Sequence, residues 1–131
     1  MYAIETRTLA DVTLNSAGSD EDLAVIANPG YDWLTYEFEV ATKDLDNFDV
    51  FGTAHPNTAN SKDFTIDWTV DPPGGHRIVE YTSTGTNENL SVTPAGGNGY
   101  FVMRVTGLSE INIKGSAVSN GTVVSHRYTL H

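Results

Sequence analysis

Four oxygen-bearing side chains stand within six residues in the segment KDLDNFDVFG, a density at which a chain could bind calcium. They are Asp44, Asp46, Asn47 and Asp49, and carboxylate and amide oxygens are ligands that calcium prefers. Calcium loops of the D-x-D-x-D-G kind also need an oxygen ligand at the fifth position and a glycine at the sixth, where this chain has Phe48 and Asp49. We therefore interpret the segment as a solvated acidic turn, and we expect no metal ion and no other cofactor.

The histidines show no metal-binding or catalytic spacing. The chain has four of them, far apart in the sequence: His55, His76, His126 and His131. The sequence also lacks the G-x-S-x-G, H-E-x-x-H, P-loop and G-x-G-x-x-G motifs. His126 alternates with Val124, Tyr128 and Leu130, which predicts a half-buried, hydrogen-bonded ring. An enzyme would need a cleft that holds His76 or His126 beside a carboxylate, and we predict that the protein is not an enzyme.

Closely spaced carboxylates occur on predicted strands, at Glu37 and Glu39 and along Asp63, Asp67 and Asp71. Glycoside hydrolysis needs two carboxyl groups that face each other across a cleft. Residues two apart on one strand face instead lie side by side. We interpret these acids as solubilising residues that also discourage pairing at a sheet edge.

Two aromatic residues are the best candidates for a contact with a sugar or another protein. Trp33 lies beside Tyr31 in the segment PGYDWL, on the opposite parity from Leu34, so its ring could be exposed. Trp68 falls on an apolar face and is not a candidate. The alternative interpretation is that Tyr31 and Trp33 pack over one end of the fold.

The elements that must position these residues are strands, because the apolar period is two almost everywhere. The clearest are 33–41 (WLTYEFEVA), with Leu34, Tyr36, Phe38 and Val40 inward, and 63–71 (DFTIDWTVD). Further strands are predicted at 3–9, 11–14, 23–27, 48–53, 76–82, 88–93, 99–106, 110–117 and 122–130. Turns are predicted where Asn, Pro and Gly cluster, as in Asn28-Pro29-Gly30 and Asn120-Gly121.

This pattern predicts an all-β fold, a single antiparallel β-sandwich of about nine or ten short strands. A jelly-roll and an immunoglobulin-like strand order both fit. No substantial helix is expected; a capped helical start at Ser19 would be cut short after one turn by Val25 and Ile26. No linker and no repeat interrupts the chain, so we expect one domain over residues 1–131.

Charge is the strongest bias of the composition. The 131 residues carry 17 acidic and 7 basic side chains and no cysteine, for a formal net charge of -10. Residues 1–71 hold 14 of the acids and 3 of the bases, whereas residues 72–131 hold 3 and 4. A negative field repels phosphate, so nucleic acid and membrane are not expected partners. The N-terminal segment has no cationic start and no apolar core, so we expect no secretory signal.

The C-terminal third resembles a segment of small structural proteins of tailed-phage virions, in which a Y-x-V-R-V-x-G-L-x-x-I-x-I-x-x-x-A-x-x-x-G-T-V-x-V-x-x-x-L pattern closes a β-sandwich as a meander. The resemblance covers about the last 32 residues and departs from the pattern at 125–127, where Ser-His-Arg replaces a Val-x-Val repeat. The matching residues are Tyr100, Val102, Arg104, Val105, Gly107, Leu108, Ile111, Ile113, Ala117, Gly121, Thr122, Val123 and Leu130.

The resemblance implies a non-enzymatic head decoration (capsid cement) protein, or else a tail or fibre appendage. It implies that the protein is made in the host cytoplasm and incorporated into the virion, that its partner is the major capsid protein or another virion protein, and that it is a homo-oligomer, with a trimer favoured. The charge asymmetry suggests that the neutral C-terminal half docks, with Arg104 and Lys114 facing the capsid, while the acidic half faces solvent. The alternative function is that of a carbohydrate-binding or host-recognition module of a phage tail or fibre.

Overall fold

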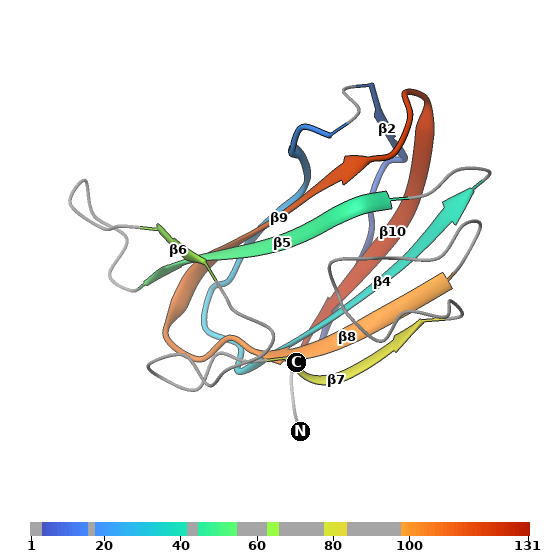
Figure 1. Ribbon diagram of the computed structural model, residues 1–131. Helices are drawn as coiled ribbons and strands as arrows, with labels where there is room; N and C mark the ends of the chain where they lie inside the picture. Colours follow the sequence, from blue (N-terminus) through green and yellow to red (C-terminus); the bar gives the residue numbers. More distant parts are fainter. Residues whose placement is uncertain (1–3, 16–17, 42–44, 55–62, 66–77, 84–97) are drawn as a thin grey trace.

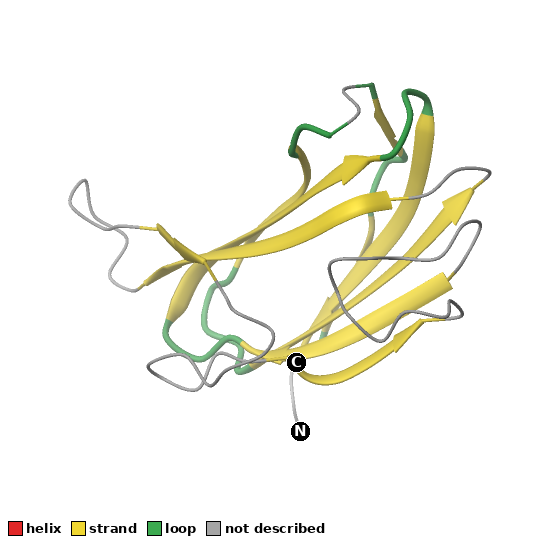
Figure 2. Cartoon of the chain, in the orientation of Figure 1, coloured by secondary structure: helices red, strands yellow, loops and turns green. Residues whose placement is uncertain are grey.

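The chain is folded into strands and connecting turns in the part that the structure describes. The computed structural model describes residues 4–15, 18–41, 45–54, 63–65, 78–83 and 98–131 (Figure 1). Among these residues no stretch is helical, and there is no helix of the length and apolarity needed to cross a membrane (Figure 2). The strands are β1 (Glu5–Thr8), β2 (Val12–Leu14), β3 (Glu21–Ala27), β4 (Trp33–Ala41), β5 (Leu45–Ala54), β6 (Asp63–Thr65), β7 (Ile78–Ser83), β8 (Asn98–Arg104), β9 (Leu108–Ala117) and β10 (Thr122–Leu130).

The strands form two antiparallel sheets. The larger sheet has the order β1-β10-β4-β8-β7, with β2 also paired to β10, and the smaller has the order β3-β9-β5-β6. Figure 1 shows them as two layers, with β5, β6 and β9 in one and β4, β7, β8 and β10 in the other. Buried side chains from both sheets form one apolar cluster. The all-β fold class with antiparallel sheets is therefore confirmed.

Four of the strand pairs are nested in the sequence. The innermost is β5 with β6, and around it lie β4 with β8, β3 with β9 and β1 with β10. Consecutive strands alternate between the sheets from β3 to β5 and again from β8 to β10. As a result β9 lies between β3 and β5, and β10 lies between β4 and the first two strands.

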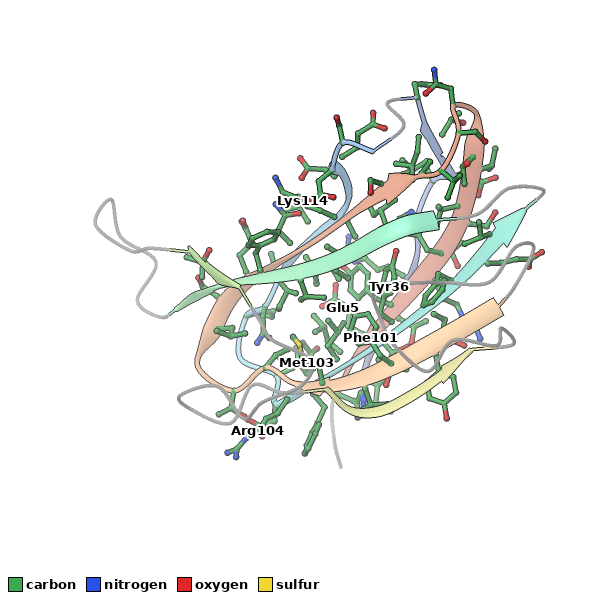
Figure 3. The ribbon with its side chains drawn as sticks, viewed as in Figure 1. Glu5, Tyr36, Phe101, Met103, Arg104 and Lys114 are labelled. Atoms are coloured by element: carbon green, nitrogen blue, oxygen red, sulfur yellow. The ribbon has the colours of Figure 1, made fainter. Side chains whose placement is uncertain are left out.

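Alternation places the core where the sequence predicts it. In β4 the side chains of Leu34, Tyr36, Phe38 and Val40 are at most 4% exposed, while the residues between them are more accessible. Tyr36 and Phe101 are cross-strand partners with ring centroids 5.4 Å apart. Figure 3 shows both, together with Met103, between the two layers. Each fully buried side chain of this size contributes roughly 1.5–3 kcal/mol.

Two charged side chains lie on β1, at one edge of the larger sheet. Glu5 and Arg7 of β1 are opposite Leu130 and Tyr128, which are buried, so they point toward the core side of the edge. The Arg7 Nε donates to the Glu5 carboxylate at 2.7 Å, and this bond raises the pKa of the Arg7 guanidinium. Inward-pointing charges on a short edge strand hinder pairing with another chain.

The acids of β4 do not prevent pairing at a sheet edge, contrary to the prediction from the sequence. β4 is an inner strand, between β10 and β8, so Glu37 and Glu39 protect no edge. Glu37 instead accepts two hydrogen bonds from the guanidinium of its cross-strand partner Arg127, at 2.6 and 2.9 Å. Because the pair is largely solvated, it contributes little to stability.

Several boundaries differ from the prediction. Residues 19–22 do not start a helix, because β3 begins at Glu21 and pairs with β9. Its acids bind neighbouring segments instead: Glu21 accepts from the Asn15 amide at 2.9 Å, and Asp22 pairs with Lys114 at 3.6 Å. The predicted strand 63–71 is described only at Asp63–Thr65. The predicted strand 88–93 and Trp68 lie outside the described residues.

The predicted C-terminal meander is wrong. β8 pairs with β4 and β7, β9 with β3 and β5, and β10 with β1, β2 and β4, so none of the three pairs with another. The chain crosses the core twice instead, first through a turn at Thr106-Gly107 and then through Asn120-Gly121. Both glycines have positive φ, 81° and 83°, a conformation that costs glycine little.

Candidate functional site

A buried asparagine joins two turns at one end of the larger sheet. Asn28, only 3% exposed, directly follows β3. Its Nδ2 lies within hydrogen-bond distance of the carbonyls of Tyr31 (3.0 Å), Val105 (3.2 Å) and Leu108 (3.0 Å). Its Oδ1 accepts from the amides of Gly30 (3.2 Å) and Tyr31 (2.8 Å). One side chain therefore fixes the β3–β4 loop against the turn between β8 and β9.

Backbone bonds complete the same junction. The amide of Val105 donates to the Asp32 carbonyl at 2.7 Å, and the amide of Leu108 donates to the Val105 carbonyl at 3.0 Å. The amide of Asn28 donates to the Ser109 carbonyl at 2.8 Å. With its polar groups paired in this way, the buried junction is a rigid support for the side chains on its outer surface.

Trp33 and Arg104 meet on that surface. They are cross-strand partners in β4 and β8, and the residues next to them, Leu34 and Met103, are fully buried. Side chains alternate along a strand, so Trp33 and Arg104 share the outer face, with Cβ atoms roughly 5 Å apart. Trp33 is half-buried and Arg104 is exposed.

Polar groups extend from this pair in two directions. The Arg104 Nε donates to the Thr106 hydroxyl at 3.1 Å, and that hydroxyl donates to the Asp32 carboxylate at 3.0 Å. On the other side, Trp33 and His131 exchange backbone hydrogen bonds of 2.8 and 2.9 Å. The imidazole of His131 lies 3.0 Å from the Thr35 hydroxyl. We name Asp32, Trp33, Arg104, Thr106 and His131 the Trp33 cluster.

The residues predicted from the sequence are thus partly brought together. Tyr31 is half-buried against the core and its backbone binds Asn28, and Trp33 is two residues further along the chain, on the outer face of the sheet. Lys114 is on the other sheet, where it pairs with Asp22 and its Nζ lies 5.6 Å from the centre of the Phe51 ring.

Arg104 and Lys114 therefore belong to different sheets. Figure 3 shows them on opposite sides of the two layers, Lys114 beside β5 and β9 and Arg104 beside β8. A division into a docking C-terminal half and a solvated N-terminal half is also not what the fold provides, because β9 and β10 are flanked by strands of the N-terminal half in both sheets.

His126 and Tyr36 form a second polar pair, inside the core. The His126 Nδ1 lies 2.6 Å from the Tyr36 hydroxyl, and its Nε2 lies 2.9 Å from the Ala10 carbonyl. A carbonyl only accepts, so the proton is assigned to Nε2, and the Tyr36 hydroxyl donates to Nδ1 of a neutral ring. Burial lowers the pKa of His126 and raises that of Tyr36. The prediction of a hydrogen-bonded ring, made from the alternation of His126 with apolar residues, is confirmed. The ring is only 5% exposed, so it is buried rather than half-buried as predicted.

Only some of the predicted candidate ligands lie within the described residues. Within the described residues, no group of three or more His, Asp or Glu side chains is arranged to hold a metal ion. His55, His76 and Asp44 lie outside those residues, and the side chains of Asp46, Asn47 and Asp49 are likewise not described.

Sequence reasoning missed Asn28 and His131. The sequence Asn-Pro-Gly at Asn28 predicts only a turn. Its hydrogen-bond partners Val105 and Leu108 are 77 and 80 residues away in the chain, so the local sequence could not indicate them. Nothing in the sequence placed His131 beside Trp33.

The Trp33 cluster is suited to binding rather than to covalent chemistry. An aromatic ring beside a guanidinium, a hydroxyl and a carboxylate offers one stacking surface and several hydrogen-bonding groups. Comparison of the chain with known protein families, with curated proteins and with solved structures found no match.

Proposed function

We propose that this protein is a non-enzymatic structural protein of a tailed-phage virion, which binds the capsid surface and stabilises the shell. The observation that carries the proposal is the nested strand pairing. Four nested antiparallel pairs, β1 with β10, β3 with β9, β4 with β8 and β5 with β6, distributed over two sheets, support a jelly-roll form of the β-sandwich. Jelly rolls are common in viral capsid proteins and in lectins, although a fold alone does not determine function.

The C-terminal resemblance adds support from the sequence side. Its pattern residues lie in β8, β9 and β10 and their turns, and its apolar positions include Val105, Leu108, Ile111, Ile113 and Leu130, which are at most 1% exposed. A protein that acts in this way stabilises the shell by binding the assembled form in preference to free subunits. A stable contact of this kind buries about 800 Å² on each partner. The proposed partner is the major capsid protein, and the proposed oligomer is a trimer.

Density-gradient fractionation of a lysate from the source tests this proposal. The chain, located by mass spectrometry, is expected to band with virus particles at a copy number comparable to that of the shell protein. A few copies per particle would replace the capsid assignment by a tail or fibre position. Recovery only in the soluble fractions, from a lysate in which particles band normally, would refute the virion function.

The Trp33 cluster favours a second candidate, a carbohydrate-binding or host-recognition module of a phage tail or fibre. A sugar ring can stack on Trp33 while its hydroxyls bond to Arg104, Thr106 and Asp32. On a glycan array, saturable binding is expected for the native protein and a loss of more than about tenfold in affinity for Trp33→Ala. The matched control is Tyr100→Ala, an aromatic of similar exposure on β8. Equal losses in the two variants would remove the site assignment.

A further inference from the structure

The turn that joins β9 to β10 carries an asparagine followed by glycine. Asn120 is exposed, and Gly121 has φ of 83°. The turn is closed by the Thr122 hydroxyl, which donates to the Ser119 carbonyl at 2.9 Å. It is also attached to β2, because the amide of Gly121 donates to the Leu14 carbonyl at 2.8 Å.

An Asn-Gly sequence can deamidate without any enzyme. Hydroxide removes the proton of the glycine amide, and the nitrogen attacks the side-chain carbonyl carbon of the asparagine. A new C–N bond closes a five-membered succinimide as the carboxamide C–N bond breaks and ammonia leaves. Water then opens the ring at either carbonyl to give aspartate or isoaspartate. The net reaction converts a carboxamide and water into a carboxylate and an ammonium ion, with no oxidant or reductant.

We propose that Asn120 is a deamidation site gated by β2. The attacking nitrogen is that of Gly121, and its hydrogen is held by the Leu14 carbonyl while β2 is paired with β10. Leu14 is fully buried and is the register partner of Thr122. The nitrogen becomes reactive when this short strand separates, because the amide is then solvated and the turn can adopt the geometry of attack. Local openings of this kind need less free energy than global unfolding.

A second Asn-Gly pair provides an internal control. Asn98 and Gly99 lie within β8, where they are the register partners of Glu39 and Phe38, and Gly99 is buried. Gly99 lies between Phe38 of β4 and Ser83 of β7, so the reaction requires β8 to separate from a neighbouring strand of the larger sheet other than β2. Asn98 therefore reports opening of the sheet, whereas Asn120 reports opening of β2 alone.

Deamidation at Asn120 would alter the fold at a sensitive position. It adds a negative charge to a chain whose net charge is already -10. Its isoaspartate product also inserts a methylene into the backbone of the turn between the two inner strands β9 and β10. A longer turn shifts the positions at which these strands enter their sheets.

The test follows both asparagines by peptide mass spectrometry during incubation at pH 8. Native protein, protein in urea and the native variants Leu14→Ala and Val12→Ala are compared. Conversion of Asn120 in native protein is expected to be slower than in urea by roughly tenfold or more. Each β2 variant is expected to accelerate Asn120 and leave Asn98 unchanged; Val12→Ala keeps the test usable if Leu14→Ala does not fold.

Two results would overturn the proposal. Native conversion of Asn120 within about twofold of the rate in urea would show that the Leu14 contact gives no protection. An equal acceleration of Asn98 and Asn120 in the β2 variants, or no acceleration of either, would show that opening of β2 does not control the site.

Discussion

Asn28→Ala is expected to lower the free energy of unfolding by about 3 kcal/mol. The substitution removes five side-chain hydrogen bonds. The Tyr31 and Leu108 carbonyls and the Gly30 and Tyr31 amides lose their Asn28 partner, whereas the Val105 carbonyl keeps its bond from the Leu108 amide. Each orphaned buried group costs about 1–3 kcal/mol, and water reaching the outer part of the loop recovers part of this. Urea denaturation followed by tryptophan fluorescence measures the change, because Trp33 lies beside the junction.

Two further variants separate the causes. Asn15→Ala removes an exposed asparagine with a single side-chain bond, 3.4 Å to the Thr13 carbonyl, and should change stability by less than about 0.5 kcal/mol. Asn28→Asp keeps the acceptor for Gly30 and Tyr31 but loses the donor to the three carbonyls. It should be about as destabilising as Asn28→Ala, since it also buries a charge. A loss below about 1 kcal/mol in Asn28→Ala would show that the junction is supported by its backbone bonds.

His126→Phe is expected to destabilise the protein by about 2 kcal/mol at pH 8, because the buried Tyr36 hydroxyl loses its acceptor. The double variant Tyr36→Phe/His126→Phe should be less destabilised than the sum of the two single variants, since the Tyr36 hydroxyl and its His126 acceptor are then removed together. His131→Phe is the matched control, an exposed histidine with one side-chain bond, and should stay within about 0.5 kcal/mol.

The same histidine should make stability depend on pH. Burial lowers the pKa of His126 in the folded state, so the unfolded chain takes up the proton first, near the ordinary pKa of about 6.5. The free energy that neutral His126 contributes is complete above that pH and is lost on acidification toward the lower folded pKa.

The difference between native protein and His126→Phe isolates this contribution, because the carboxylates titrate in both proteins. Urea denaturation between pH 8 and pH 5 should therefore show the difference shrinking as pH falls. A difference that grows would mean that the charged ring is the stabilised form, held by Asp11, whose charge opposes the effect of burial.

The parts of the fold that follow from local pattern could be predicted from the sequence. In β4 and β10, alternation identifies the buried face residue by residue, because successive side chains point to opposite sides of a sheet. Alternation gives no information about which strand is the neighbour. The resemblance predicts a meander of the last three strands, in which the short connection at Thr106-Gly107 would join paired strands. Only the packing of β9 between β3 and β5 decides otherwise.

The candidate site was predictable only in part for the same reason. Trp33 could be selected from its parity, and Arg104 from the charge asymmetry, but their contact depends on the register of β4 with β8. Asn28 appeared as a turn residue because its local sequence is a turn. Its role as a junction depends on a turn 77 residues later in the chain.

The position of β9 and β10 has a consequence for how the chain folds as it leaves the ribosome. These inner strands of both sheets are synthesised after every strand that they separate. Until they emerge, β3 and β5 lack their shared neighbour, and β1, β2 and β4 lack theirs. Several strands with one apolar face therefore remain unpaired in the nascent chain until translation of this segment is complete. The N-terminal strands consequently cannot fold first as a separate unit. The acidic side chains that outnumber the basic ones in residues 1–71 repel one another during that interval and help keep this part of the nascent chain soluble.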